Sequence, residues 1–261
     1  MEKISEYIAK KNENREKILS IFLTSGFPDK SKFAELAVDV LNAGADMLEI
    51  GFPFSDPLAD GPTIQYSSQQ ALDNGINIKS TFNYIKEIRK TSDKPLILMG
   101  YANPVLSYGQ ISFADDAKSA GVNGVIIPDV PINEYHNFFD GTFDGLEKIL
   151  LTTPTTSEDR VKKIDELSEG FVYYVSMTGT TGKQVKHSEE ILNPLIRTHS
   201  LIKKNKMLIG FGISSPDDVK TFAPYCSGVI VGSAVIKSLI NEDRTSTLKL
   251  ISGLKEALNH N

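Results

Sequence analysis

The chain has 261 residues, of which 40% are hydrophobic and 23% charged, a mixture typical of a soluble globular protein. A formal net charge of −5 argues against general binding to nucleic acid, which requires a basic face. No apolar stretch approaches the roughly 20 residues of a membrane span, and residues 1–17 alternate in charge without the apolar centre of a secretion signal.

Cysteine and histidine give little sign of redox or metal chemistry. The single cysteine, Cys226, cannot form an internal disulfide and suits a reducing cytoplasm, where we expect a small buried thiol. The four histidines lie in polar segments and none has the spacing of a metal-ligand set; they are His136, His187, His199 and His260. The sequence therefore predicts no metal site.

In chain order, the first element is an amphipathic helix over about the first eleven residues, with Ile4, Tyr7 and Ile8 on one face. Eight short apolar runs rich in β-branched residues follow and predict strands. They are 18–24, 45–51, 95–101, 124–130, 148–154, 171–177, 206–212 and 228–234. Helical patterns lie between most of them, but residues 132–147 have a poor helical period and predict only a short helix.

Three of the helical patterns carry further signals. The pattern after the first run has one apolar face and ends in Gly44, a plausible C-terminal cap; the face consists of Phe33, Leu36, Ala37, Val40 and Leu41. The segments that begin at Ser157 and Ser215 open with serine and acidic residues, which suit a helix N-terminus.

Nearly continuous apolar strands that alternate with helices predict a parallel sheet covered on both faces. Eight such units match the count of a (β/α)8 TIM barrel, an α/β fold, and a doubly wound sheet is the alternative. No linker or charge run marks a boundary, so we expect residues 1–261 to form a single TIM-barrel domain. The extra N-terminal helix would plug the bottom of this barrel.

Glu49 is an acid inside the second apolar run, near the end of a predicted strand. Active residues of a parallel barrel lie at the carboxyl ends of the strands and in the loops that follow. If Leu48 and Ile50 face the helices, Glu49 points into the barrel, where burial would raise its pKa and suit it to acid–base catalysis. The alternative is a structural glutamate paired with a cation, but no basic residue ends any of the eight runs.

The loop after Glu49, FPFSDPLADGP, contains two more carboxylates, Asp56 and Asp60. An Asp-Gly pair is common in turns, and for Asp56 in the sequence SDP a turn-forming role is the better interpretation. Asp60 is the stronger candidate for a functional acid, because the three prolines of this loop restrict its conformations and could hold the carboxylate over a pocket.

The last two predicted strands end in glycines. Gly210 and Gly212 lie at the end of the seventh run, and Gly232 and Ser233 lie at the end of the eighth. Barrels often bind phosphate between these two loops, with backbone N–H groups and the N-terminus of a short helix facing the anion.

The segment TGTTGKQVKHS, residues 178–188, is small and polar, which suits a mobile lid. It differs from a nucleotide-binding P-loop in its spacing, and no Ser or Thr follows Lys183.

Six motifs in this order resemble the tryptophan synthase alpha subunit family: LEIGFPFSDPLADGP (48–62), MGYANPV (99–105), PDVP (128–131), TGTTG (178–182), GFGISSP (210–216) and GSAVIK (232–237). The resemblance implies a barrel that cleaves indole-3-glycerol phosphate to indole and glyceraldehyde 3-phosphate without a cofactor of its own. It also implies a partner, the tryptophan synthase beta subunit, in a heterotetramer of two alpha and two beta subunits. That partner would carry pyridoxal phosphate (PLP) and would join the indole, received through a tunnel, to serine.

The same resemblance implies roles for individual residues. Glu49 would be the catalytic acid–base, and Asp60 would stabilise positive charge at the indole nitrogen. The implied substrate-binding residues are Phe22, Met99, Tyr101, Leu151, Tyr173, Thr181 and Phe211, and the implied phosphate-binding residues are Gly182, Gly212, Gly232 and Ser233. Asp129 and residues 103–107 would face the partner. Met177 departs from relatives that have an arginine there, so no lid-docking role of that arginine carries over.

Three other functions fit parts of the pattern. Two carboxylates on a barrel could form a glycosidase pair, although the chain has no Trp on which a sugar could stack. Another phosphate-binding barrel, such as an isomerase, would not need both Glu49 and Asp60. A chain that only activates a partner enzyme would not need either acid.

Overall fold

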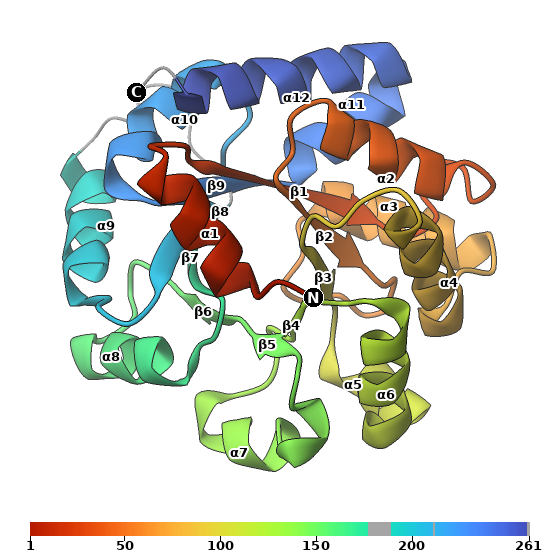
Figure 1. The fold of residues 1–261 in the computed structure, drawn as a ribbon, viewed down its shortest axis with the longest axis horizontal. Helices are drawn as coiled ribbons and strands as arrows, with labels where there is room; N and C mark the ends of the chain where they lie inside the picture. Colours follow the sequence, from red (N-terminus) through yellow and green to blue (C-terminus); the bar gives the residue numbers. More distant parts are fainter. Residues whose placement is uncertain (177–188, 211, 260–261) are drawn as a thin grey trace.

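The computed structural model describes residues 1–176, 189–210 and 212–259, and its centre is a ring of parallel strands surrounded by helices (Figure 1). The strands are β1 Ile18–Thr24, β2 Met47–Gly51, β3 Leu96–Met99, β4 Gly124–Ile126, β5 Glu147–Lys148, β6 Leu150–Thr152, β7 Phe171–Val175, β8 Lys206–Gly210 and β9 Gly228–Val231. The α-helices are α1 Ile4–Glu13, α2 Phe33–Asn42, α3 Pro62–Asp73, α4 Ile78–Arg89, α5 Ala102–Tyr108, α6 Gln110–Ala120, α7 Tyr135–Phe138, α8 Glu158–Leu167, α9 Glu189–Leu201, α10 Pro216–Phe222, α11 Ser233–Asn241 and α12 Arg244–Asn259. Three short 3₁₀ helices are η1 Ile132–Glu134, η2 Gly141–Phe143 and η3 Ala223–Tyr225.

The ring of strands is closed. The strands lie in the order β5-β4-β3-β2-β1-β9-β8-β7-β6, and each pairing is parallel. β5 and β6 stand at the two ends of this order, yet only Ile149 separates them in the chain. They are therefore two halves of one strand, and the nine segments assigned in the described residues make the eight strands of a TIM barrel. The doubly wound alternative is wrong, because that sheet is open at both edges.

The expected apolar patterns account for these elements. Each of the eight predicted runs contains a strand of the ring. The face predicted for α2 is buried in full, and Gly44 follows that helix with a φ of 124°. The hydroxyl of Ser215 accepts a hydrogen bond from the N–H of Asp218 and caps α10, whereas the side chain of Ser157 makes no such bond at the start of α8. Before β5 begins at Glu147, the segment 132–147 contains only the four residues of α7 and two 3₁₀ turns, as expected.

The N-terminal helix plugs one end of the barrel, as expected from its apolar face. Figure 1 shows α1 lying across the ring, and Ile4 and Ile8 are fully buried against inward residues of the strands, among them Ile18. The carboxylate of Glu147 accepts hydrogen bonds from the backbone N–H of Ile4 and, at 2.9 Å, from the hydroxyl of Ser5. The first turn of α1 is thus held by a strand, and the bottom of the barrel is apolar.

The remaining sequence expectations concern cysteine, metal and membrane. Cys226 is buried as expected, and burial raises the pKa of its thiol to about 11, so it is a poor nucleophile. The described part of the chain contains no group of His, Cys, Asp and Glu side chains placed to hold a metal ion; His187 and His260 lie outside it. None of the described helices is long and apolar enough to cross a membrane.

Candidate active site

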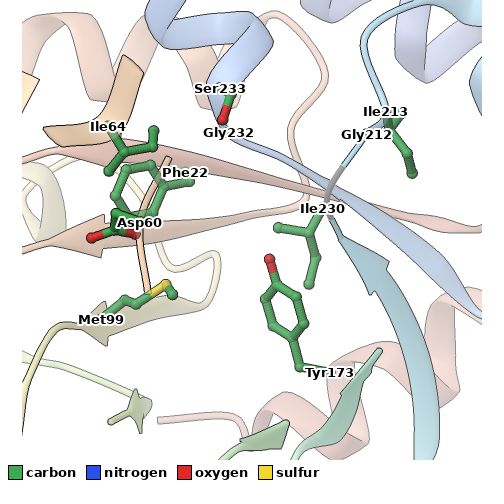
Figure 2. Close-up of a pocket in the computed structure, with 10 residues that line it drawn as sticks. All are labelled: Phe22, Asp60, Ile64, Met99, Tyr173, Gly212, Ile213, Ile230, Gly232 and Ser233. Atoms are coloured by element: carbon green, nitrogen blue, oxygen red, sulfur yellow. The ribbon is translucent and has the colours of Figure 1, made fainter. Parts of the chain in front are cut away.

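A cavity opens at the end of the barrel where the strands finish, opposite α1. It contains about 500 Å³ of empty space, part of it open solvent. Its walls are Phe22, Asp60, Ile64, Met99, Tyr173, Gly212, Ile213, Ile230, Gly232 and Ser233, shown in Figure 2. This is the end of a barrel at which active sites form.

Glu49 lies in the barrel interior at the base of this region. It is the strand neighbour of Phe22 in the cavity wall, and its side chain is 0% exposed. The hydroxyl of Ser20 donates a hydrogen bond of 2.8 Å to Oε1 of Glu49, whereas Oε2 has no hydrogen-bond partner among the described residues. Burial raises the pKa of the Glu49 carboxyl to about 8, and the bond from Ser20 opposes this only in part. At neutral pH, burial therefore favours the protonated form of Glu49.

Among the residues that the structure describes, no Lys or Arg forms the ion pair that the structural alternative for Glu49 requires. A buried acid of that kind lies directly before β2: Asp46 accepts hydrogen bonds from Nζ of Lys255 at 2.7 Å and from the N–H of Leu19 at 2.8 Å. Glu49 has only a neutral hydroxyl as its partner within the described residues. An acid kept uncharged in this way is a candidate for proton transfer rather than for stabilisation.

Asp60 is half-buried in the loop after β2 and lines the cavity together with Phe22 and Met99. The hydroxyl of Tyr101 donates a hydrogen bond of 2.9 Å to Oδ2 of Asp60 and accepts one of 3.1 Å from the N–H of Ala59. Burial raises the pKa of Asp60, and the bond from Tyr101 opposes that effect. Tyr101 thus fixes both the carboxylate and the loop that carries it. Asp56, in contrast, is exposed, as expected of a turn former.

Tyr173 is a wall residue of the cavity whose pKa responds to both acids. Figure 2 shows its ring rising from β7, with the hydroxyl directed into the cavity. The pKa of Tyr173 is raised well above its usual range, first by burial and then by the negative charges of Glu49 and Asp60. The charges of both carboxyl groups therefore act on this aromatic hydroxyl.

Two glycines make room for the aromatic walls. A Cβ added to Gly51 would lie 2.5 Å from the ring of Phe22, and one added to Gly210 would lie 2.2 Å from the hydroxyl oxygen of Tyr173. No larger residue fits at either position without moving these rings. The sequence analysis missed this role, since only the barrel register brings each glycine against its ring.

Three of the four predicted phosphate residues, Gly212, Gly232 and Ser233, line the cavity. Gly212 has a φ of 78°, in the left-handed region that favours glycine. Gly232 and Ser233 begin α11, and Figure 2 shows Ser233 at the start of that helix, beside the cavity. Because the first N–H groups of a helix carry partial positive charge, this arrangement can hold an anion.

The other expected site residues fall into two groups. Leu151 lines a groove that adjoins the cavity and shares Asp60 and Met99 with it, and Tyr101 lines a second pocket that shares the same two residues. The expected positions Thr181, Gly182 and Phe211, as well as Met177 and the whole lid segment 178–188, lie outside the described residues. Sequence reasoning missed the wall residues Ile64, Ile213 and Ile230, whose apolar side chains are like many in the core.

Comparison with known proteins decides the family. A family model described as "Tryptophan synthase alpha chain" matches residues 8–259. The chain belongs to the tryptophan synthase alpha chain family. The tryptophan synthase alpha chain of Flavobacterium psychrophilum is 42% identical over 247 residues, which cover 94% of this chain and 98% of that one. That of Geotalea daltonii is 38% identical over 263 residues, 99% of each chain. Tryptophan synthase subunit alpha of Legionella pneumophila, a solved structure, matches with a TM-score of 0.91 and 33% identity, covering 100% of both chains.

As a member of the tryptophan synthase alpha chain family, the chain is an indole-3-glycerol-phosphate lyase, which confirms the activity implied by the six motifs. The family carries no cofactor of its own, and PLP belongs to the beta chain. The glycosidase, isomerase and purely activating alternatives are therefore wrong for this chain.

The protonated Glu49 predicts an unusual dependence of stability on pH. Between about pH 4.5 and about pH 8 the unfolded chain has lost the Glu49 proton and the folded chain retains it. The folded state then binds more protons, so rising pH favours unfolding, by up to roughly 1.4 kcal/mol per pH unit from this group. The variant Glu49→Gln cannot ionise. In urea unfolding from pH 5 to pH 9 we expect it to gain stability relative to the wild type up to about pH 8 and then hold a constant advantage. A constant difference across the whole range would mean that Glu49 has an ordinary pKa when folded.

Proposed function

We propose that the cavity binds indole-3-glycerol phosphate and that Glu49 transfers the protons of its retro-aldol cleavage while Asp60 stabilises the charged indole ring. The observation that carries this proposal is the state of Glu49. Its carboxyl is fully buried, it has no cation beside it among the described residues, and one of its two oxygens is without a hydrogen bond there. The family assignment supplies the reaction, and this carboxyl supplies a group able to carry it out.

The chemistry needs one proton delivered and one removed at neighbouring atoms. Protonation of the indole ring at C3 gives a cationic indolenine, with Glu49 as the acid. As the C3–C3′ bond breaks, its electron pair returns to the ring, and the C3′ hydroxyl loses its proton to the Glu49 carboxylate and becomes the aldehyde. Indole and glyceraldehyde 3-phosphate leave, and Glu49 is again protonated. A pKa of about 8 suits this exchange, because acid–base catalysis is most effective when the pKa of the group is near the working pH.

Asp60 would act as a fixed negative charge. In the indolenine the positive charge lies on the ring nitrogen, and an ionised carboxylate beside that N–H lowers the energy of the state in which the charge develops. The half-exposed position of Asp60 leaves it more water than Glu49 has, and the hydroxyl of Tyr101 favours its ionised form. The two acids thus differ in the way the reaction requires.

The walls of the cavity suit the two ends of this substrate. Phe22, Ile64 and Met99 offer apolar surface to an indole ring next to Asp60, and Leu151 extends that surface into the adjoining groove. At the other side, Gly212, Gly232 and Ser233 would bind the phosphate through backbone N–H groups, the Ser233 hydroxyl and the N-terminus of α11.

For a partner, we infer a tryptophan synthase beta subunit in a heterotetramer of two alpha and two beta subunits. Leu58 in the loop after β2, Leu106 in α5 and Ile111 in α6 are more than half exposed, at 95%, 54% and 68%. Leu106 lies within the segment 103–107 that the family resemblance directs towards the partner, and all three residues follow β2 or β3 on the side of the barrel that carries the cavity. A solved relative from M. tuberculosis, 27% identical, is described as tryptophan synthase in an aminoacrylate-bound form.

Replacement of the two acids tests their roles. We expect Glu49→Gln to lower kcat for indole release by about 10²–10⁴-fold with little change in substrate affinity, because the amide keeps the shape but cannot exchange protons. Asp60→Asn should lower kcat by about 10²–10³-fold through the lost charge. The matched control is Asp56→Asn, which removes an exposed acid from the same loop and should leave cleavage within about twofold of the wild type. A Glu49→Gln enzyme with more than about a tenth of wild-type activity would rule out Glu49 as the proton donor.

The phosphate site is tested by an added negative charge. Ser233→Asp puts a carboxylate in the first turn of α11, where an acid is compatible with the helix but would repel a bound phosphate. We expect KM to rise at least about tenfold, as for the loss of roughly 1.4 kcal/mol of binding. Ser246→Asp makes the same change in the first turn of α12, away from the cavity walls, and should leave KM unchanged. An equal KM in the wild type, Ser233→Asp and Ser246→Asp would mean that the phosphate does not bind at the N-terminus of α11.

A further inference from the structure

Ser20 is a polar residue in an apolar layer of the barrel. It lies in β1 between Leu19 and Ile21, is fully buried, and is the strand neighbour of Met47. The inward residues around it form the cluster that includes Ile18, Met47 and Ile97. A buried hydroxyl without a partner destabilises a protein, so such a serine needs a hydrogen bond to be tolerated. The bond that Ser20 makes in the described structure is the one of 2.8 Å to Oε1 of Glu49.

This bond makes the two oxygens of Glu49 unequal. Oε1 is engaged by Ser20, whereas Oε2 is buried with no hydrogen-bond partner in the described part of the chain. A carboxyl held by one oxygen has a defined rotation about its last bond. Its other oxygen is then available to a bound substrate.

We infer that Ser20 is a positioning residue for the lyase reaction: its hydroxyl holds Oε1 of Glu49 so that Oε2 exchanges protons with the substrate. This inference rests on the proposed role of Glu49 as the acid–base group. It adds a residue that none of the six sequence motifs contains, since the motifs begin at Leu48.

A hydroxyl suits this task in both halves of the reaction. It donates to Oε1 of the carboxylate, and it donates equally to Oε1 as the carbonyl oxygen of the neutral acid when the proton is on Oε2, so the Ser20–Glu49 bond persists whether Glu49 is charged or neutral. Donation to the carboxylate favours the charged form and lowers the pKa of Glu49, against the effect of burial. Loss of the hydroxyl should therefore raise that pKa further and make Glu49 a poorer acid.

The experiment compares three serine variants. We expect Ser20→Ala to lower kcat by roughly 10–100-fold, the equivalent of one hydrogen bond to a charged group, with KM within about twofold of the wild type. The alkaline limb of the kcat–pH profile, where Glu49 loses its proton, should move to higher pH. Ser20→Thr keeps the hydroxyl, so it should retain most of the wild-type kcat and show the alkaline limb at the wild-type pH. The control is Ser25→Ala, because Ser25 is equally buried in the segment after β1 but accepts its hydrogen bond of 2.8 Å from Thr81 of α4; its profile should match the wild type.

Two results would overturn the inference. One is a Ser20→Ala enzyme with wild-type kcat and an unmoved alkaline limb. The other is a fall in kcat that accompanies lower resistance to urea without any shift of the limb, which would make Ser20 structural only.

A parallel measurement separates this inference from the proposed role of Glu49. If Glu49→Gln is inactive and Ser20→Ala is normal, only the role of Ser20 fails, whereas an active Glu49→Gln enzyme removes the basis of both. The double variant Ser20→Ala/Glu49→Gln should be no slower than Glu49→Gln, because Ser20 acts through Glu49. A further loss in the double variant would contradict that route.

Discussion

The chemistry proposed for this barrel depends on one carboxyl group, Glu49, whose burial opposes its ionisation. Glu49 is surrounded by the interior of the barrel and bonded to a neutral hydroxyl, so its ionisation is opposed by the loss of water rather than assisted by a cation. This arrangement requires a barrel that is filled with apolar side chains on the α1 side of Glu49 and is open to substrate on the other side. The apolar residues Ile4 and Ile8 of α1 close the lower end, and the cavity at the carboxyl ends of the strands opens the upper one.

The chain handles its buried acids in two ways. Asp46, at the same end of the barrel as α1, is bonded to Lys255 of the C-terminal helix and joins distant parts of the fold. Within the described residues Glu49 has no such partner, and it is correspondingly less favourable to stability at neutral pH. The same sequence thus contains one buried acid bonded to a cation and one bonded to a neutral hydroxyl, and the difference lies in the charge of the neighbour.

Much of the fold could be predicted from local patterns. The eight strands follow from short apolar runs, and the inward orientation of Glu49 follows from the alternation of side chains along β2, since Leu48 and Ile50 pack outside with the helices. The fifth strand is less regular than its sequence suggests: it is interrupted at Ile149, and the hydroxyl of Ser168 bonds to the N–H of the next residue, Leu150. Strand interruptions of this kind depend on neighbouring elements and leave no local signal.

The site could be predicted only in part. Glu49 and Asp60 stand out because acids are rare in strands and because three prolines stiffen the loop of Asp60. The contact of Ser20 with Glu49, the bond of Tyr101 to Asp60 and the fit of Gly210 against Tyr173 each join strands or loops far apart in the sequence. They depend on the register of the closed barrel, which no single stretch of sequence specifies.

Glu49 is expected to be an uncharged acid in the resting enzyme. Infrared difference spectroscopy of the wild type against Glu49→Gln tests this most directly. We expect the wild type near pH 6 to show the carbonyl band of a protonated carboxylic acid that is absent from the variant. On raising the pH, that band should give way to a carboxylate band with a midpoint of about 8. A carboxylate band for Glu49 already present near pH 6 would contradict the account.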